Sequence, residues 1–149
     1  MIGIRQPTIA DKKGLISLAC IWPNGSLLVP IHEERCTAEG RPIPLLDDPN
    51  WCIRVAIDHE AKDTVVGYAI ATRHNHLGIL IAELEEIFVS WDCQRKGIGS
   101  LLVQAFEAWA QLAECGKCII GGGPAPEFYE SLGYQRHKPL MCSFEKILR

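Results

Sequence analysis

The segment AELEEIFVSWDCQRKGIGSLLVQAFEAW, residues 82–109, changes from a strand pattern to a helix pattern across a glycine-rich turn. Residues 82–90 carry Leu, Ile, Phe and Val between charged side chains and predict a strand. From Gly97 onward, apolar side chains recur at three- and four-residue spacing, which predicts an amphipathic helix: Ile98, Leu101, Leu102, Ala105, Trp109 and Leu112. Gly116 fits the position just past the end of this helix.

The turn itself combines positive charge with bare backbone, because Arg95 and Lys96 precede Gly97 and Gly99. A strand that enters such a turn and leaves as a helix aims free backbone N–H groups at one point. The helix dipole adds partial positive charge there, so the pattern predicts a phosphate site. The alternative is that the two glycines only shape the turn.

The rest of the chain mixes strands with helices. Strands are predicted at residues 2–5, 51–58, 64–73, 117–121 and 140–147, with 51–58 and 64–73 as an antiparallel hairpin. A capping box of Thr8 and Asp11 begins a first helix, and a short helix at 126–132 is stopped by Gly133. We place Tyr134 on a strand with its hydroxyl at the surface. Helices inserted among strands indicate an α+β fold, a mixed sheet with helices on its faces.

Residues 22–50 are irregular and rich in proline and glycine. We expect a long loop here, with a short helix around His32–Cys36. Loops of this length in compact domains are usually functional.

The composition is that of an ordinary globular domain, with 149 residues, 48% of them hydrophobic and 22% charged. We expect residues 1–149 to form one domain. The formal net charge is −3, so no nucleic-acid partner is expected. No apolar stretch approaches the ~20 residues that span a bilayer, and no signal-peptide pattern begins the chain. Seven scattered cysteines indicate reduced thiols and a cytoplasmic protein.

Three motifs together resemble the GNAT superfamily of N-acetyltransferases. The first is Q-x-x-G-x-G from Gln94 to Gly99, and the second is L-x-x-I-x-V from Leu84 to Val89. The third is A-x-x-F-Y-E-x-L-G-Y from Ala125 to Tyr134, and the opening IRQPTIADKKGLISL is also similar to that family's first strand and helix. The resemblance implies a central, mostly antiparallel sheet that is splayed at the cofactor site, with helices on both faces.

The resemblance also implies an acetyl-CoA site between the strand at 82–90 and the strand at 117–121. The loop backbone would hold the pyrophosphate, the strand backbone would pair with the pantetheine arm, and Phe128 would contact the cofactor. The implied residues are Ile87, Phe88, Val89, Gln94, Arg95, Lys96, Gly97, Ile98, Gly99, Ser100 and Phe128. The sequence departs from the family at Gly122, where members often have an asparagine.

Acyl transfer to an amine needs a base for the ammonium and an acid for the leaving thiolate. By resemblance, Tyr129 is the candidate acid and Glu83 the candidate base. Glu85 is a further catalytic candidate, because neighbouring carboxylates can raise one another's pKa. Strand alternation predicts that Glu83 and Glu85 share a face, while Glu86 points with Leu84 and Phe88. The alternatives are that Phe128 and Tyr129 are core aromatics, with Phe128 packed on Leu132, and that the glutamates form a solvated face.

The motif CGKC, residues 115–118, is weighed as a redox or zinc site and set aside. It follows a helix rather than opening one, and zinc would need two more ligands, for which only His74 and His76 offer a pair. We therefore expect no metal.

The resemblance, taken with these residues, implies transfer of an acetyl group from acetyl-CoA to a primary amine of a small molecule or a protein. The alternative is a non-catalytic acyl-CoA sensor or interaction module on the same fold. Candidate walls of the acceptor site are Trp22, His32, Glu33 and Trp51. Homodimerisation is left open.

Overall fold

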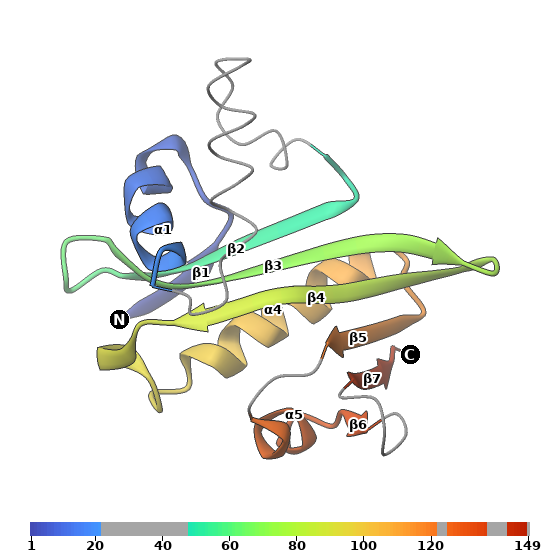
Figure 1. The fold of residues 1–149 in the computed structure, drawn as a ribbon. Helices are drawn as coiled ribbons and strands as arrows, with labels where there is room; N and C mark the ends of the chain where they lie inside the picture. The colour runs from blue at the N-terminus through green and yellow to red at the C-terminus, as the bar shows by residue number, and fades with distance from the viewer. Residues whose placement is uncertain (22–47, 122–124, 137–142, 149) are drawn as a thin grey trace.

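The computed structural model describes residues 1–21, 48–121, 125–136 and 143–148. Within them, seven strands form one sheet in the order β1-β2-β3-β4-β5-β7-β6 (Figure 1). The strands are β1 Ile2–Arg5, β2 Trp51–Asp58, β3 Thr64–His76, β4 Ile79–Val89, β5 Lys117–Gly121, β6 Gln135–Arg136 and β7 Ser143–Ile147. Neighbouring strands are antiparallel except β4 and β5, which are parallel. The α+β mixed sheet is therefore confirmed, and β3 and β4 are both longer than predicted.

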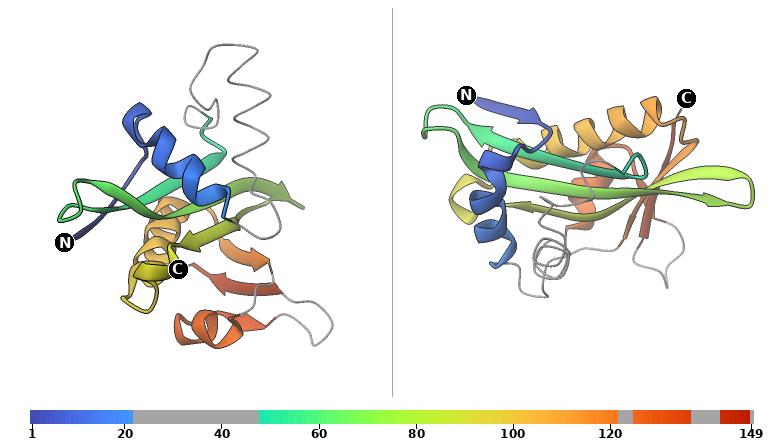
Figure 2. Two further views of the ribbon diagram at one scale, coloured as in Figure 1. Left: turned by 60° about the vertical axis from the view of Figure 1, so that its left-hand side comes forward. Right: turned by 90° about the horizontal axis from the view of Figure 1, so that it is seen from above.

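The helices lie on opposite faces of this sheet, as the view from above in Figure 2 shows for α1, Lys12–Ala19, and α4, Ile98–Leu112. On the α1 side, Leu15 and Leu18 pack against Tyr68 and Ile70 of β3. On the α4 side, Leu102 and Phe106 belong to a second buried cluster that covers β3, β4 and β5. The sheet is thus buried on both faces, which fixes the direction of each side chain on its central strands.

The predicted capping box is present at the start of the first helical segment, a 3₁₀ turn η1 at Ile9–Asp11 that leads into α1. Asp11 accepts a hydrogen bond from the backbone N–H of Thr8 at 2.6 Å and another from its hydroxyl at 2.9 Å. Arg5 adds an ion pair at 2.6 Å. Because of this pair and the Thr8 bonds, the pKa of Asp11 falls to about 2.

The end of α4 differs from the prediction. The left-handed residue after the helix is Glu114, with φ 59°, and not Gly116. The N–H of Cys115 bonds to the carbonyl of Ala110, and the N–H of Glu114 bonds to that of Gln111, which completes a Schellman motif. Gly116 instead links neighbouring elements, because its N–H donates to Leu80 and its carbonyl accepts from Leu148.

The predicted position of Tyr134 was also wrong. Tyr134 follows the helix α5, Pro126–Ser131, and is only 2% exposed, with its hydroxyl buried. The two-residue strand β6 after it was not predicted, and β7 begins at Ser143. Predictions on His32–Cys36, Trp22, Glu33, Gly122 and residues 140–142 lie outside the described residues. Among the described helices, none is long and apolar enough to cross a membrane.

Candidate active site

The sheet opens between its two parallel strands. Pairing of β4 with β5 ends at Leu84 and Ile120, but β4 runs on to Val89 whereas β5 stops at Gly121. A cavity of about 1050 Å³ fills this opening. Its walls are the second half of β4, the loop that follows, the first turn of α4, the end of β5, and α5. The unpaired edge of β4 is therefore a backbone surface that faces the cavity.

The glycine loop closes one end of the cavity. The side chain of Gln94 donates to the carbonyl of Val89 at 3.1 Å, which ties the loop back to β4. Arg95 and Gly97 both have left-handed backbone, with φ 62° and 80°. These angles turn the chain so that α4 begins at the cavity, and the first N–H groups of a helix have no partner within it. They belong to Ile98 and its two successors, which line the cavity.

The cations of the loop have different positions. Arg95 lines the cavity, whereas Lys96 is exposed and is not part of its wall. Both residues were predicted to contact the cofactor. Within the described residues, the other predicted cofactor contacts all line this one space: Ile87, Phe88, Val89, Gln94, Gly97, Ile98, Gly99, Ser100 and Phe128.

The short helix α5 forms the opposite wall. A Cβ atom at Gly99 would lie 3.2 Å from Cζ of Phe128, so the ring packs directly on the loop backbone. This contact gives Gly99 a structural reason to lack a side chain, besides any role toward an anion. Phe128 is half-buried and also packs against the core, as does the neighbouring Leu132.

Tyr129 also faces the cavity but is only 7% exposed. Its ring packs against Phe128, Phe144 and Tyr134, with centroids 5.0, 5.3 and 6.4 Å apart. Burial raises the pKa of the phenol above its usual value. Tyr129 therefore stays protonated at neutral pH.

A β-bulge in β4 changes which carboxylates share a face. Ala71 pairs with Leu84 and Ile70 with Glu86, so Glu85 has no opposite residue on β3. The extra residue shifts the alternation. Leu84 therefore packs on the α4 side, while Phe88 packs on the α1 side.

The predicted orientation of Glu86 was consequently correct relative to Phe88 and wrong relative to Leu84. Glu86 accepts a hydrogen bond from the hydroxyl of Tyr68, which lies on the α1 side, so Glu86 points with Phe88 but not with Leu84. It is 5% exposed and lines the cavity. Sequence reasoning left Glu86 out of the candidate site, because strict alternation assigned it to the other face.

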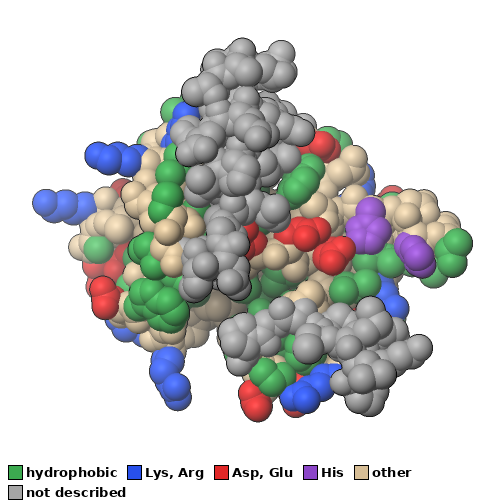
Figure 3. Space-filling view, in the orientation of Figure 1, with side chains coloured by type: hydrophobic (Ala, Val, Ile, Leu, Met, Phe, Trp, Pro, Cys, Tyr) green, Lys and Arg blue, Asp and Glu red, His purple; other side chains and the backbone are tan. Residues whose placement is uncertain are grey.

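Glu83 and Glu85 lie on the α1 side next to polar groups of β3. Glu85 accepts from the Thr72 hydroxyl at 2.7 Å, and Glu83 lies 3.9 Å from Nδ1 of His74. Burial, and secondarily Glu85, raises the pKa of Glu83, while His74 opposes the rise. Glu85 lines the cavity and Glu83 does not. Figure 3 shows acidic and histidine side chains gathered over β3 and β4 on this face.

Further cavity-lining residues were not predicted. Trp91 of the 3₁₀ turn η4, Trp91–Cys93, is exposed and lines the cavity. Its ring and that of Phe88 pack edge-to-face, with centroids 5.7 Å apart. Ile120 forms part of the wall at the point where β5 leaves β4. The sequence offers no signal for these residues, because their position depends on where the strands diverge.

The CGKC segment lies in the core. Cys115 and Cys118 are both buried, and burial raises the pKa of Cys118 to about 12. A thiol with so high a pKa is a poor nucleophile and a poor metal ligand at neutral pH. In the part of the chain that the structure describes, no three His, Cys, Asp or Glu side chains gather as metal ligands would.

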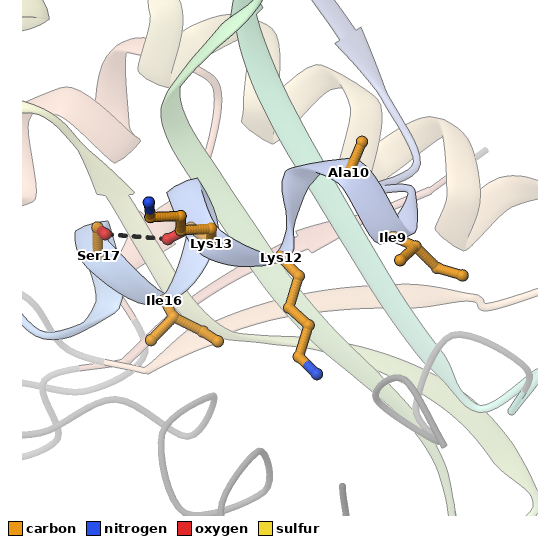
Figure 4. Close-up of a pocket in the computed structure, with 6 residues that line it drawn as sticks. All are labelled: Ile9, Ala10, Lys12, Lys13, Ile16 and Ser17. Atoms are coloured by element: carbon orange, nitrogen blue, oxygen red, sulfur yellow. Dashed lines mark hydrogen bonds between the residues drawn. The ribbon is translucent and has the colours of Figure 1, made fainter. Parts of the chain in front are cut away.

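A smaller hollow of about 460 Å³ lies on the outer surface of η1 and α1 (Figure 4). It is lined by Ile9, Ala10, Lys12, Lys13, Ile16 and Ser17, and the hydroxyl of Ser17 is bonded to the carbonyl of Lys13 at 2.9 Å. Among the described residues, neither a carboxylate nor an aromatic ring lines it, and we assign it no chemistry.

Residues 49–136 match the sequence profile of the acetyltransferase (GNAT) domain. Because this match covers more than half of the chain, the protein belongs to the GNAT family of acetyl-CoA-dependent N-acetyltransferases. A comparison with curated protein sequences gives no match.

Solved structures share the fold at low sequence identity. Glucosamine-6-phosphate N-acetyltransferase from Arabidopsis thaliana has a TM-score of 0.72 and 18% identity, over 95% of this chain and 96% of that one. The PaiA N-acetyltransferase from Thermoplasma acidophilum, in complex with coenzyme A, has a TM-score of 0.72 and 16% identity, over 99% of both chains. An acetyltransferase from Trypanosoma brucei has a TM-score of 0.70 and 19% identity, over 95% of this chain and 97% of that one. At such identities these structures support the fold alone.

Proposed function

We propose that this enzyme transfers the acetyl group of acetyl-CoA to a primary amine of a small molecule or of a protein, within one domain formed by residues 1–149. The observation that carries the proposal is the divergence of β4 from β5. It leaves a strand edge and a large cavity that end at a glycine loop and a helix N-terminus.

In this proposal, acetyl-CoA lies along the second half of β4. The pantetheine arm pairs with the backbone of Ile87–Val89, as an added strand would. The pyrophosphate lies on the loop from Gln94 to Ser100, where the helix N-terminus and Arg95 supply positive charge. Phe128 covers the arm from the other wall. The thioester then lies near Tyr129, because Tyr129 and the diverging end of β5 face the same space.

The chemistry needs three proton transfers. A carboxylate, Glu83 or Glu85, removes the first proton of the ammonium, directly or through water. The amine nitrogen then attacks the thioester carbonyl carbon, the C–S bond breaks, and the sulfur takes a proton from Tyr129. The nitrogen, now positively charged, gives its second proton to the Tyr129 phenolate, so that the products are the neutral amide and the free thiol and the acid is regenerated. A raised pKa suits Glu83 to a base, and positioned proton transfer is typically worth ~10²–10⁴-fold in rate.

The charge of the α1 side supports a cationic acceptor. Glu83, Glu85 and Glu86 lie together there, in a chain whose net charge is already −3. Carboxylates of this kind attract an ammonium and raise its local concentration.

An amine-panel acetylation assay with detection of free thiol tests the proposal. We expect acetyl-CoA consumption that depends on an added amine, with small polyamines, amino sugars and peptides as the first acceptors to try. The matched measurement is acetyl-CoA binding by calorimetry. Binding without turnover on any amine would instead support a sensor, and the absence of binding would refute the cofactor site.

A further inference from the structure

A partly buried ion pair between Lys146 of β7 and Glu107 of α4 lies next to α5, and neither side chain lines the cavity. Lys146 also donates to the carbonyl of Leu132, the C-cap residue of α5. We propose that Lys146, held by Glu107, is a positioning residue that keeps Tyr129 at the cavity wall. The inference rests on the proposed role of Tyr129 as proton donor.

The contacts of Lys146 join three elements at one ammonium group. Its Nζ atom donates to the two carboxylate oxygens of Glu107 at 3.0 and 3.1 Å, and to the carbonyl oxygen of Leu132 at 3.1 Å. The same atom lies 5.5 Å from the centre of the Tyr134 ring. The side chains of Lys146 and Glu107 are 31% and 18% exposed, so water screens the pair only in part.

The helix α5, whose C-terminal end contacts this ammonium, is not stable without tertiary contacts. With six residues, α5 is shorter than any helix that is stable in isolation, so its position depends on tertiary contacts. At its C-terminus the dipole is negative and its last carbonyls lack partners within the helix. A lysine that bonds to such a carbonyl while anchored on a neighbouring helix fixes both the position and the direction of α5.

The link from Lys146 to Tyr129 is short. Gly133 has φ 88°, and the N–H of Tyr134 bonds to the carbonyl of Tyr129 at 3.1 Å, so a Schellman motif ends the helix. The ring of Tyr134, under the ammonium, in turn packs edge-on against the ring of Tyr129. A shift of the ammonium is therefore transmitted to Tyr129 by both backbone and ring.

A double-mutant cycle separates positioning from general stability. Lys146→Met keeps the length of the side chain and removes its charge and its hydrogen bonds. We expect kcat to fall about tenfold, because displacing a positioned acid loses part of its effect, with KM for acetyl-CoA within about twofold of wild type. In the Tyr129→Phe background the same substitution should change kcat by less than about twofold, because the group it positions is already gone.

Lys117 offers a matched control. It pairs with Glu145 across β5 and β7, so Lys117→Met makes the same chemical change in the same sheet. We expect its kcat to stay within about twofold of wild type. Lys146→Arg, which retains the charge and donors, should recover most of the activity. Should Lys146→Met not fold, Glu107→Gln takes its place in the cycle, with an expected loss of about threefold that again vanishes in Tyr129→Phe.

Two results would overturn the inference in distinguishable ways. Equal losses from Lys146→Met in both backgrounds would show that Lys146 acts independently of Tyr129, and would leave the acid role of Tyr129 intact. A kcat within twofold of wild type for Tyr129→Phe alone would reject that acid role, and the positioning role with it.

Discussion

Replacing Arg95 tests the phosphate site with little disturbance of the fold. Arg95 lines the cavity with a left-handed backbone, φ 62°, which a residue with a Cβ adopts at a cost of roughly 1–2 kcal/mol. Arg95→Gly removes the guanidinium and also removes this strain, because glycine tolerates the conformation. The extra freedom of glycine in the unfolded chain costs roughly 0.5–1 kcal/mol. We therefore expect the free energy of unfolding to stay the same or to rise by up to about 1.5 kcal/mol.

The expected loss is in cofactor affinity. A hydrogen bond from a charged group is worth about 1.5–3 kcal/mol. Arg95 is an exposed residue at the cavity wall, so the free energy of its hydrogen bond to the phosphate should lie near the lower limit of this range. Each 1.4 kcal/mol is a factor of about ten in Kd, which predicts a Kd for acetyl-CoA about tenfold higher, with a weaker dependence on salt.

Lys96 provides the control, because it carries the same charge one residue along but does not line the cavity. Calorimetric titration of acetyl-CoA at two salt concentrations should show Lys96→Ala within about twofold of wild type. The reasoning fails if Arg95→Gly binds as tightly as wild type, or if both substitutions weaken binding equally.

Three further predictions concern other parts of the molecule. Tyr129→Phe keeps the ring contacts and removes the proton, so kcat at saturating acetyl-CoA should fall ~10²-fold, about 2.7 kcal/mol in the barrier; a change within twofold removes Tyr129 from the mechanism. Asp11→Asn should lower the free energy of unfolding at pH 7 by roughly 1–2 kcal/mol, discounted because Arg5 is partly exposed. The folded-state pKa of Asp11 is depressed to about 2, so urea titrations should show this difference fading as the pH falls from about 4 toward 2; a difference constant with pH would contradict the assignment. The double substitution of Cys115 and Cys118 by Ala should leave kcat within about twofold, and loss of bound stoichiometric zinc in a metal assay would show that these buried thiols were ligands.

The sequence predicted most elements because their periodicity is strong. The helix begins within a residue of Gly97 as predicted, and the strands at 2–5, 51–58 and 117–121 have the predicted bounds. One local feature was not predicted. The left-handed position after α4 is taken by Glu114, although glycine is the usual residue there and Gly116 stands two positions away.

The candidate site was harder to predict, because its geometry depends on contacts between distant residues. The bulge at Glu85 inserts one residue into β4, and the apolar pattern on either side is compatible with strict alternation. Leu84 and Phe88 are both buried, so their burial does not reveal that they lie on opposite faces. Tyr134 is likewise buried by residues distant in the sequence, because it belongs to the same core cluster as Cys118 and Phe144.

Backbone hydrogen exchange in the presence of CoA tests the central claim most directly. If the cofactor lies along β4 and on the glycine loop, CoA should slow exchange in the segment from Ile87 to Ser100, where the strand edge and the helix N-terminus have N–H groups without partners in the sheet or helix. Exchange in β1 and α1 should not change. Protection confined to other segments, or binding of CoA with no protection between Ile87 and Ser100, would contradict the account.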